Sequence, residues 1–313
     1  MLIEVNQIVK RYKELIALDH FDFHVKEGEI VGLLGPNGSG KTTLINCMLA
    51  LLKYDKGEVR LFGRPMRSDD WATKARIGVV PQSLAYFPQL TVWENIDYFC
   101  GLYVDDKDER REKIHDAIAF TGLEGYEKFL PKKLSGGMRR RLNIACGVAH
   151  RPELLFLDEP TVAVDAQSRN FILEGVQKMN DEGTSIVYTT HYLEEAQQIC
   201  TRIVIMDKGK NIAEGTLDEL MAMIDTAEII HIRFPNAFPE VVDMIHRLPH
   251  ILDVKTANDG MSHILKFAKD ADNLYRLMAL LNEHNVPYTE LYSERPSLND
   301  VFLAFTGKEL RDA

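Results

Sequence analysis

Short and almost continuously apolar stretches recur along the first two thirds of the chain. They run from Glu29 to Leu34, Arg76 to Pro81, Leu154 to Pro160, Thr184 to Thr190 and Arg202 to Gly209. Apolar runs of this length, without polar alternation, are typical of strands that are covered on both faces. The pattern therefore predicts an α/β domain with a mostly parallel sheet and helices packed around it.

A segment of helical periodicity interrupts these strands between Leu84 and Gly147. Within it, Thr91 and Glu94 have the spacing of a capping box, in which two side chains bond to the free backbone N–H groups of a helix start. We therefore expect a helical insertion in the α/β domain at about residues 84–147.

The pattern changes again after about Asp225. Strand-like and helix-like stretches then follow in the order β-α-β-β-α-β, with a turn at Asn258 to Gly260 and a last helix from Pro296. This order is the split βαβ plan of ferredoxin-like domains. We expect a first domain at residues 1–224 and a small α+β accessory domain at 225–313, with no linker rich in Gly or Ser between them.

Composition and charge narrow the possible classes of protein. The 313 residues are enough for two domains, and a 45% hydrophobic composition supports a core in each. The net charge of -10 disfavours a nucleic-acid partner, because nucleic acids are bound by basic surfaces. The four cysteines are widely spaced and predict neither a zinc site nor a disulfide framework. No signal-like leader or membrane-length apolar stretch is present, so we expect a protein that is soluble by itself.

A glycine-rich stretch follows the first of the apolar strands and opens an apolar helix. It matches the phosphate-binding pattern G-x-x-x-x-G-K-[ST], with the residues Gly35, Pro36, Asn37, Gly38, Ser39, Gly40, Lys41 and Thr42. Glycines let the backbone turn its N–H groups toward phosphate oxygens, and the helix N-terminus adds a favourable dipole. We expect Lys41 to contact the β- and γ-phosphates of a nucleotide and the Thr42 hydroxyl to ligate Mg²⁺.

Two adjacent carboxylates end the apolar stretch that begins at Leu154. Asp158 is placed to reach Mg²⁺, and Glu159 to orient or deprotonate a water molecule. Alone, such a pair is more often a solvated strand end. The phosphate-binding loop in the same domain favours the catalytic interpretation.

A second candidate phosphate loop, Ser135-Gly136-Gly137, lies directly before a predicted helix. The Ser135 hydroxyl and the free N–H groups of the helix start together form an anion cradle. Taken alone, the tripeptide is more simply an ordinary serine cap. The arginines that follow, Arg139 to Arg141, are assigned no role.

In their order along the chain, these motifs resemble the nucleotide-binding subunit of an ATP-binding cassette (ABC) transporter. The two longer motifs resemble that family's Walker A and Walker B motifs, and Leu134 to Met138 resembles its signature loop. Gln82 matches the Q-loop, His191 the switch histidine, and Tyr12 the aromatic residue that stacks on adenine. Singly, each of these three residues is more often a loop amide, a surface or core histidine, or a packing aromatic. Only their order favours the functional interpretation.

The resemblance implies an ATPase that uses ATP and Mg²⁺. It makes Glu159 the catalytic carboxylate, Gln82 a Mg²⁺ and water contact, and His191 a γ-phosphate contact. The implied nucleotide-binding residues are Tyr12, Gly35, Pro36, Asn37, Gly38, Ser39, Gly40, Lys41, Thr42, Thr43, Ser135, Gly136, Gly137 and Asp165, and the implied Mg²⁺ ligands are Thr42, Gln82 and Asp158.

The resemblance also implies a fold and an assembly. The expected fold is a P-loop NTPase cassette with N-terminal antiparallel strands. Two copies are expected to associate head to tail, each ATP lying between the P-loop of one and the Ser135–Gly137 loop of the other. A separate membrane permease is the implied partner, contacted by the loop from Ser83 to Leu90. The protein would then be cytoplasmic and peripheral on the inner face of the cell membrane.

Two departures from the family pattern concern the contact between copies. Met138 replaces the glutamine that is commonest at the fifth signature position, and Val162 to Gln167 differ from the usual D-loop, although Asp165 is retained. Because Glu159 and His191 are both present, we expect a site that hydrolyses ATP, with an altered contact between copies.

The C-terminal segment favours an export pump over other uses of the cassette. Pro296 to Asp312 resembles the closing segment of exporter ATPases of the drug-resistance and sodium-export group. An importer ATPase is an alternative, although importers often carry a C-terminal β-barrel module that the two helical patterns here disfavour. A soluble ABC protein acting on ribosomes or DNA, or a P-loop kinase, explains fewer of the motifs. The expected role of the C-terminal domain is to strengthen the dimer, and a ligand-sensing role is the alternative. The transported substrate is not specified by the sequence.

Overall fold

The structure is a computed structural model that describes residues 1–269 and 272–307. The chain divides into two compact units, of which the first begins at Met1 and ends at Leu217 and the second begins at Asp218. Residues 308–312 of the exporter-like closing segment lie outside the described residues.

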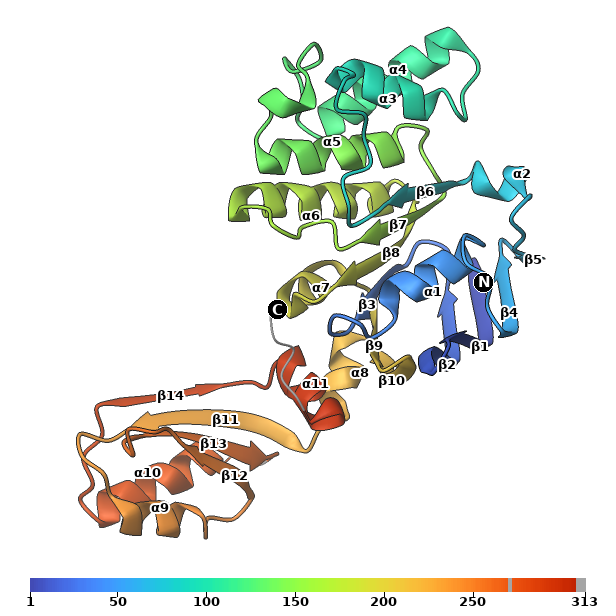
Figure 1. Ribbon diagram of the computed structural model, residues 1–313. Helices are drawn as coiled ribbons and strands as arrows, with labels where there is room; N and C mark the ends of the chain where they lie inside the picture. Colours follow the sequence, from blue (N-terminus) through green and yellow to red (C-terminus); the bar gives the residue numbers. More distant parts are fainter. Residues whose placement is uncertain (270–271, 308–313) are drawn as a thin grey trace. The chain divides into compact units, whose positions relative to one another are not determined.

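A six-stranded sheet forms the centre of the first unit (Figure 1). Its strand order is β10-β9-β3-β8-β7-β6, and all neighbours are parallel except β10, which pairs antiparallel with β9. The strands are β3 (Ile30–Leu34), β6 (Ile77–Val80), β7 (Leu154–Asp158), β8 (Ser185–Thr190), β9 (Arg202–Asp207) and β10 (Lys210–Gly215). The five parallel strands coincide with the five apolar stretches of the sequence, as predicted.

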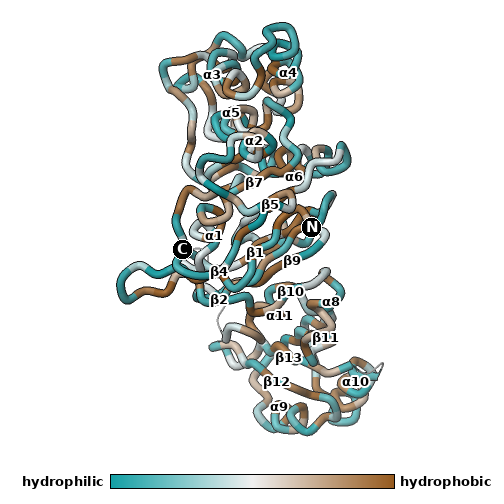
Figure 2. Tube along the Cα trace, turned by 90° about the vertical axis from the view of Figure 1, so that its right-hand side faces the viewer, coloured by the Kyte–Doolittle hydropathy of each residue, from teal (hydrophilic) through white to brown (hydrophobic). Residues whose placement is uncertain are grey.

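Helices cover both faces of this sheet. Those of the first unit are α1 (Lys41–Met48), α2 (Trp71–Lys74), α3 (Val92–Cys100), α4 (Lys107–Phe120), the 3-10 turn η1 (Pro131–Lys133), α5 (Gly136–Val148), α6 (Ala166–Asp181) and α7 (Leu193–Ile199). Phe156 and Val187 pack into a core with α1, whereas Leu155 and Ile186 pack on the opposite face with α5 and α6. Burial on both faces explains why the strands lack polar alternation. Figure 2 shows the same contrast, with apolar strands such as β7 and β9 and polar connections at the periphery.

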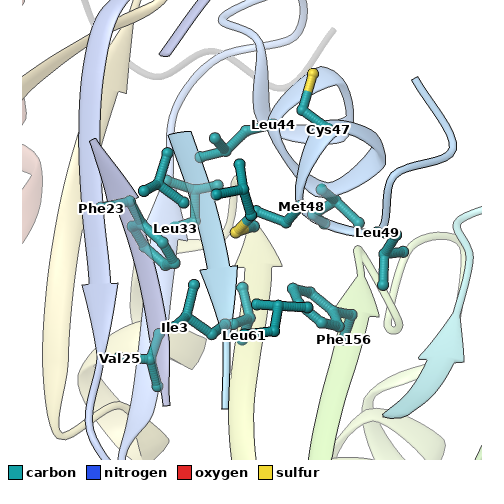
Figure 3. Close-up of a cluster of buried hydrophobic side chains, with 14 of the residues drawn as sticks. Ile3, Phe23, Val25, Leu33, Leu44, Cys47, Met48, Leu49, Leu61 and Phe156 are labelled. Carbon is teal, nitrogen blue, oxygen red and sulfur yellow. The ribbon is translucent and has the colours of Figure 1, made fainter. Parts of the chain in front are cut away.

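A second, antiparallel sheet in the order β2-β1-β4-β5 packs on α1. Its strands are β1 (Ile3–Tyr12), β2 (Leu15–Val25), β4 (Lys56–Leu61) and β5 (Arg64–Pro65). Leu44 and Met48 of α1 are fully buried among Ile3, Phe23 and Leu33 (Figure 3). The helix that follows the glycine-rich loop is therefore fixed between two sheets, which gives the loop a rigid base.

The helical insertion has its own core, formed by α3, α4 and α5. Val92 and Ile96 of α3 pack with Leu142 of α5. The predicted capping box is present, because Glu94 N donates to Thr91 Oγ1 at 3.2 Å and Thr91 N donates to Glu94 Oε2 at 2.7 Å.

The second unit is a four-stranded antiparallel sheet in the order β12-β13-β11-β14. Its elements are α8 (Leu217–Ala222), β11 (Thr226–Arg233), α9 (Pro239–Ile245), β12 (Ile251–Thr256), β13 (Ser262–Ala268), α10 (Asn273–Glu283), β14 (Glu290–Glu294) and α11 (Leu298–Thr306). The first strand lies between the third and the fourth, which is the ferredoxin-like arrangement. Ile230 and Phe267, on one face of the sheet, share a core with Val241 of α9 and Leu277 of α10. The predicted fold class, a P-loop cassette followed by a small α+β domain, is confirmed.

Candidate active site

The glycine-rich loop adopts a backbone that only glycine fits at two positions. Gly40 has a φ of 115°, and a Cβ there would lie 2.6 Å from the Ala17 carbonyl oxygen. A Cβ on Gly35 would lie 2.3 Å from the Met206 carbonyl oxygen. Helix α1 begins at Lys41 without a side-chain cap, and the Ser39 hydroxyl is 2% exposed with no partner among the described residues. Free N–H groups at a helix start and an unpaired buried hydroxyl fit an anionic ligand such as a triphosphate.

Lys41 points back across this loop toward the end of β7. Its ammonium donates to the carbonyl oxygens of Gly35 at 2.7 Å and Pro36 at 3.2 Å, and it lies 3.4 Å from Glu159 Oε1. Burial lowers the pKa of Lys41, while the neighbouring Glu159 carboxylate acts in the opposite direction. The pair is almost fully buried, with side-chain exposures of 5% and 6%. A cation and a carboxylate are thus held side by side at the phosphate-binding loop.

Asp158 connects the loop to the sheet through both of its carboxylate oxygens. Thr42 Oγ1 donates to Oδ2 at 2.9 Å, and Thr189 Oγ1 donates to Oδ1 at 2.6 Å. Neighbouring ligands of an octahedral Mg²⁺ with bonds of about 2.1 Å lie about 3.0 Å apart. The separation of the Thr42 and Asp158 oxygens therefore fits two ligands of one Mg²⁺.

Glu159 is the point where several segments converge. Gln82 Nε2 donates to its Oε2 at 2.8 Å, and His191 Nδ1 lies 3.5 Å from the same oxygen. Its φ of 48° is in the left-handed region that side-chain-bearing residues rarely adopt. The conformation is held by its own N–H, which donates to the hydroxyl of Thr189 at 3.0 Å. A strained backbone that aims a buried carboxylate at a lysine, a glutamine and a histidine is typical of a reactive centre.

Other predicted site residues lie elsewhere in the chain. Ser135 caps α5 by accepting from Met138 N at 3.2 Å, and both Ser135 and Gly136 are exposed. Helix α5 packs on the face of the sheet opposite to α1 (Figure 1). Tyr12 is 46% exposed at the end of β1, where the Lys10 ammonium lies 5.1 Å from its ring centre. Within the described residues, no hydrogen bond joins Ser135 or Tyr12 to the glycine-rich loop of the same chain.

Asp165 lies beside the Ser135–Gly137 loop. It caps α6 by accepting from Ser168 N at 2.9 Å, and hydrogen bonds from Ser168 lower its pKa. A Cβ on Gly137 would lie 2.3 Å from Ser168 Oγ and 3.1 Å from Asp165 Oδ2. The starts of α5 and α6 therefore form one surface, on which two of the predicted nucleotide-binding segments are neighbours.

Comparison with known proteins extends these observations over the whole chain. The family model described as ABC transporter matches residues 18–162. The linearmycin resistance ATP-binding protein LnrL of Bacillus subtilis is 34% identical over 99% of this chain and 100% of its own length. This chain belongs to the ABC transporter family. The daunorubicin/doxorubicin resistance ATP-binding protein DrrA of Streptomyces peucetius is 35% identical and the Nod factor export ATP-binding protein I of Paraburkholderia xenovorans 33%, each over 99% of this ABC protein and at least 94% of its own length.

Solved structures agree with this assignment. The cassette MJ0796, in a dimeric post-hydrolysis state bound to ADP and Pi, superposes with a TM-score of 0.64 and 29% identity, over 69% of this chain and 98% of its own. A structure described as the ATP-binding subunit of an ABC transporter gives a TM-score of 0.66 and 26% identity, over 71% and 93%. The protein is an ABC ATPase, as the motifs predicted. No helix in the described ranges has the length and apolarity that a membrane span requires.

The structure adds residues to this ABC site that the sequence analysis did not assign. Arg140 Nη1 donates to the Gln82 carbonyl oxygen at 2.8 Å. Asn143 Nδ2 donates to the Pro81 carbonyl oxygen at 3.2 Å, and its Oδ1 accepts from Ala85 N at 2.7 Å. Burial lowers the pKa of Arg140, and Glu159 opposes this effect. The only signal in the sequence was the spacing of Arg140 and Asn143, which are three positions apart and so lie on one face of the helix. Their contacts identify α5 as the helix that supports the Gln82 loop.

Proposed function

We propose that this ABC ATPase drives an export pump whose membrane permease is a separate chain. The support for export comes from relatives of similar length, whose names describe linearmycin resistance, Nod factor export and daunorubicin/doxorubicin resistance. Because these relatives match along 99% of this chain, the accessory unit is included in the similarity and not only the cassette. An importer ATPase is the less favoured alternative.

The phosphate chain of ATP is bound by the glycine-rich loop, residues 35–42, and by the first turn of α1, which includes Thr43. Lys41 contacts the β- and γ-phosphates, and the Thr42 hydroxyl, Asp158 and Gln82 hold Mg²⁺ directly or through water. When bound, Mg²⁺ neutralises charge on the phosphate oxygens. Tyr12 stacks on adenine. The support for the phosphate and Mg²⁺ contacts is the 2.9 Å contact of Thr42 with Asp158 and the free N–H groups at the start of α1.

Hydrolysis depends on Glu159, which orients and deprotonates the attacking water. Gln82 positions that water, and His191 contacts the γ-phosphate and the developing charge on it. The single observation that carries this proposal is the convergence of Lys41, Gln82 and His191 on the Glu159 carboxylate. These side chains come from three different segments, and all three lie within 3.5 Å of the Glu159 carboxylate. A water or phosphate oxygen beside Glu159 is therefore within reach of each of them.

The complete site is formed by two copies of the chain. The Ser135–Gly137 loop caps a helix on the face of the sheet opposite to α1, which supports a role at the P-loop of a second copy rather than at its own. Asp165 lies on the same surface and contributes to the contact between copies. The dimeric state of the related cassette MJ0796 supports this arrangement. The role we propose for the accessory unit is to strengthen the dimer.

The permease is contacted by the loop from Ser83 to Leu90, which places the ATPase on the cytoplasmic face of the membrane. Leu84 and Phe87 in this loop are exposed. The Phe87 ring packs against the rings of Tyr98 and Phe99 on α3, whose centres lie 4.8 and 5.9 Å from its own. Exposed aromatic and aliphatic side chains on a rigid base fit the centre of a protein interface.

The proposed chemistry is tested by Glu159→Gln, which keeps the size of the side chain and removes its basicity. Hydrolysis is expected to fall by about 10²–10⁴-fold, the usual contribution of a general base, with ATP binding preserved. The exposed Glu194→Gln is the matched control and should leave hydrolysis unchanged. Full activity of Glu159→Gln would contradict the proposal.

The proposed partner is tested by isolating the tagged protein from a detergent extract of membranes. Recovery of a multi-span membrane protein with it, lost on Phe87→Asp, supports the permease assignment. Sedimentation with ribosomes in place of membranes would favour the soluble class of ABC protein instead.

A further inference from the structure

Glu195 is a buried carboxylate that the proposed mechanism does not use. It lies on α7, four residues after His191, and is 2% exposed. Its Oε1 accepts from Thr161 Oγ1 at 2.6 Å, and its Oε2 accepts from Tyr188 OH and Thr190 Oγ1, both at 2.9 Å. Burying a carboxylate is costly unless it is hydrogen-bonded, so three donors on one side chain indicate a built arrangement.

The donors belong to the segments that carry the proposed catalytic residues. Thr161 is two residues after Glu159, in the connection to α6, and Thr190 directly precedes His191. Arg169 on α6, whose Nε lies 3.4 Å from Glu195 Oε1, adds the helix that Asp165 caps. The Glu195 carboxylate therefore accepts hydrogen bonds both from the segment after Glu159 and from the segment before His191.

The Thr190 hydroxyl transmits this contact to the His191 turn. It donates to Glu195 and accepts from Tyr192 N at 2.9 Å, so the backbone on both sides of His191 is fixed. A second route runs through side chains, because the Arg169 guanidinium lies 4.5 Å from the Tyr192 ring centre and that ring lies 4.2 Å from the His191 ring. Movement of α7 or of α6 would displace His191 relative to Glu159.

We propose that Glu195 is a positioning residue for ATP hydrolysis, which holds the His191 turn and the segment after Glu159 in one geometry. The inference rests on the proposed roles of Glu159 and His191. A displacement of about 1 Å at a reacting group is enough to lower a rate by about 10²-fold, so a rigid link between these two segments has a direct kinetic effect. Binding of ATP is expected to be retained without this link, because the phosphate chain is held by Lys41 and the P-loop, which belong to other segments, and His191 adds only its contact with the γ-phosphate.

The first test compares serine with valine at two positions. Thr161→Val and Thr190→Val keep the shape of threonine and remove the hydroxyl, whereas Thr161→Ser and Thr190→Ser keep the hydroxyl and remove a methyl group. We expect kcat to fall at least about tenfold in both valine variants and to stay within about twofold of wild type in both serine variants. The opposite order, in which valine is tolerated and serine is not, would show that packing alone matters and would overturn the proposal.

The second test is Glu195→Gln, with the neighbouring exposed Glu194→Gln as the matched control. The number of ATP-binding sites per chain and the Kd for ATP are expected to match wild type, while kcat falls at least about tenfold. A kcat that is unchanged, or that falls only in proportion to lost ATP-binding sites, would overturn the positioning role.

Glu159→Gln, measured in the same series, separates failure of this inference from failure of the proposed function. If Glu159→Gln abolishes hydrolysis and Glu195→Gln does not, the positioning role alone is wrong. If Glu159→Gln retains full hydrolysis, the catalytic assignment fails, and the positioning role fails with it.

Discussion

The Thr42 hydroxyl and the Asp158 carboxylate lie 2.9 Å apart, although 116 positions separate them in the sequence. Thr42 follows β3 and Asp158 ends β7, and these strands are not neighbours in the sheet because β8 lies between them. Thr189, at the end of β8, spans the gap by donating to Asp158 at 2.6 Å. The carboxyl ends of three adjacent parallel strands thus meet at one edge of the sheet, which is where open α/β sheets generally bind ligands.

Thr189→Val is expected to weaken Mg²⁺ binding in the presence of ATP. The hydroxyl orients Asp158 and is itself buried, so its loss frees the carboxylate to turn away from Thr42. Removal of such an outer partner typically lowers metal affinity about 10- to 100-fold. The measurement is ATPase activity against Mg²⁺ concentration, with Thr189→Ser as the control that retains the hydroxyl. An unshifted Mg²⁺ dependence in Thr189→Val would contradict the role of Thr189 in orienting Asp158 toward the metal.

Tyr12→Ala is expected to raise KM for ATP while leaving kcat at saturation close to wild type. Stacking of an aromatic ring on a base contributes about 1–3 kcal/mol and is shared by the ground and transition states. Tyr12→Phe keeps the ring and should retain the wild-type KM. Steady-state kinetics over a range of ATP concentrations checks both variants, and an unchanged KM in Tyr12→Ala would mean that the exposed ring of Tyr12 does not meet adenine.

His150 is expected to make the first unit less stable as the pH falls. Burial lowers the pKa of His150 to about 4, and its Nε2 donates to the Ile77 carbonyl oxygen at 3.1 Å. Between pH 6.5 and 4 the unfolded chain therefore binds a proton at this residue that the folded chain does not. The resulting loss of unfolding free energy is about 3 kcal/mol at pH 4, and stability is retained above pH 6.5.

Urea unfolding followed by tryptophan fluorescence measures this effect, because both tryptophans, Trp71 and Trp93, belong to the first unit. The control variant His150→Phe cannot titrate. The free energy of unfolding of wild type minus that of His150→Phe should decrease between pH 7 and 4. A pH-independent difference would show that His150 is not held neutral by the fold.

Much of this architecture was predictable because its signals are local. The strands of the large sheet are buried on both faces, so their apolar runs are unbroken, and the order of elements after Asp225 is sufficient to specify the ferredoxin-like unit. The phosphate-binding loop was recognisable since its glycines meet backbone constraints, such as the φ of 115° at Gly40, that hold whatever the surroundings.

The supporting residues were not predictable from their own neighbourhood. Arg140 lies among three consecutive arginines, and only tertiary packing distinguishes the one that binds the Gln82 carbonyl oxygen. Glu195 follows another glutamate, and the periodicity of a short helix does not indicate that one is buried and the other exposed. Such roles depend on contacts between segments that are far apart in sequence.

A hybrid dimer shows whether each ATP is hydrolysed between two copies of the chain. One subunit carries Lys41→Ala, and the other carries Ser135→Arg, which places a bulky cation where the hydroxyl would meet a phosphate. If the P-loop of one copy faces the Ser135 loop of the other, both lesions fall in one site and the second site is intact. Mixing the two inactive variants is then expected to restore ATPase activity above that of either alone. No restoration, together with wild-type specific activity that is independent of concentration in a monomeric preparation, would contradict hydrolysis between two copies.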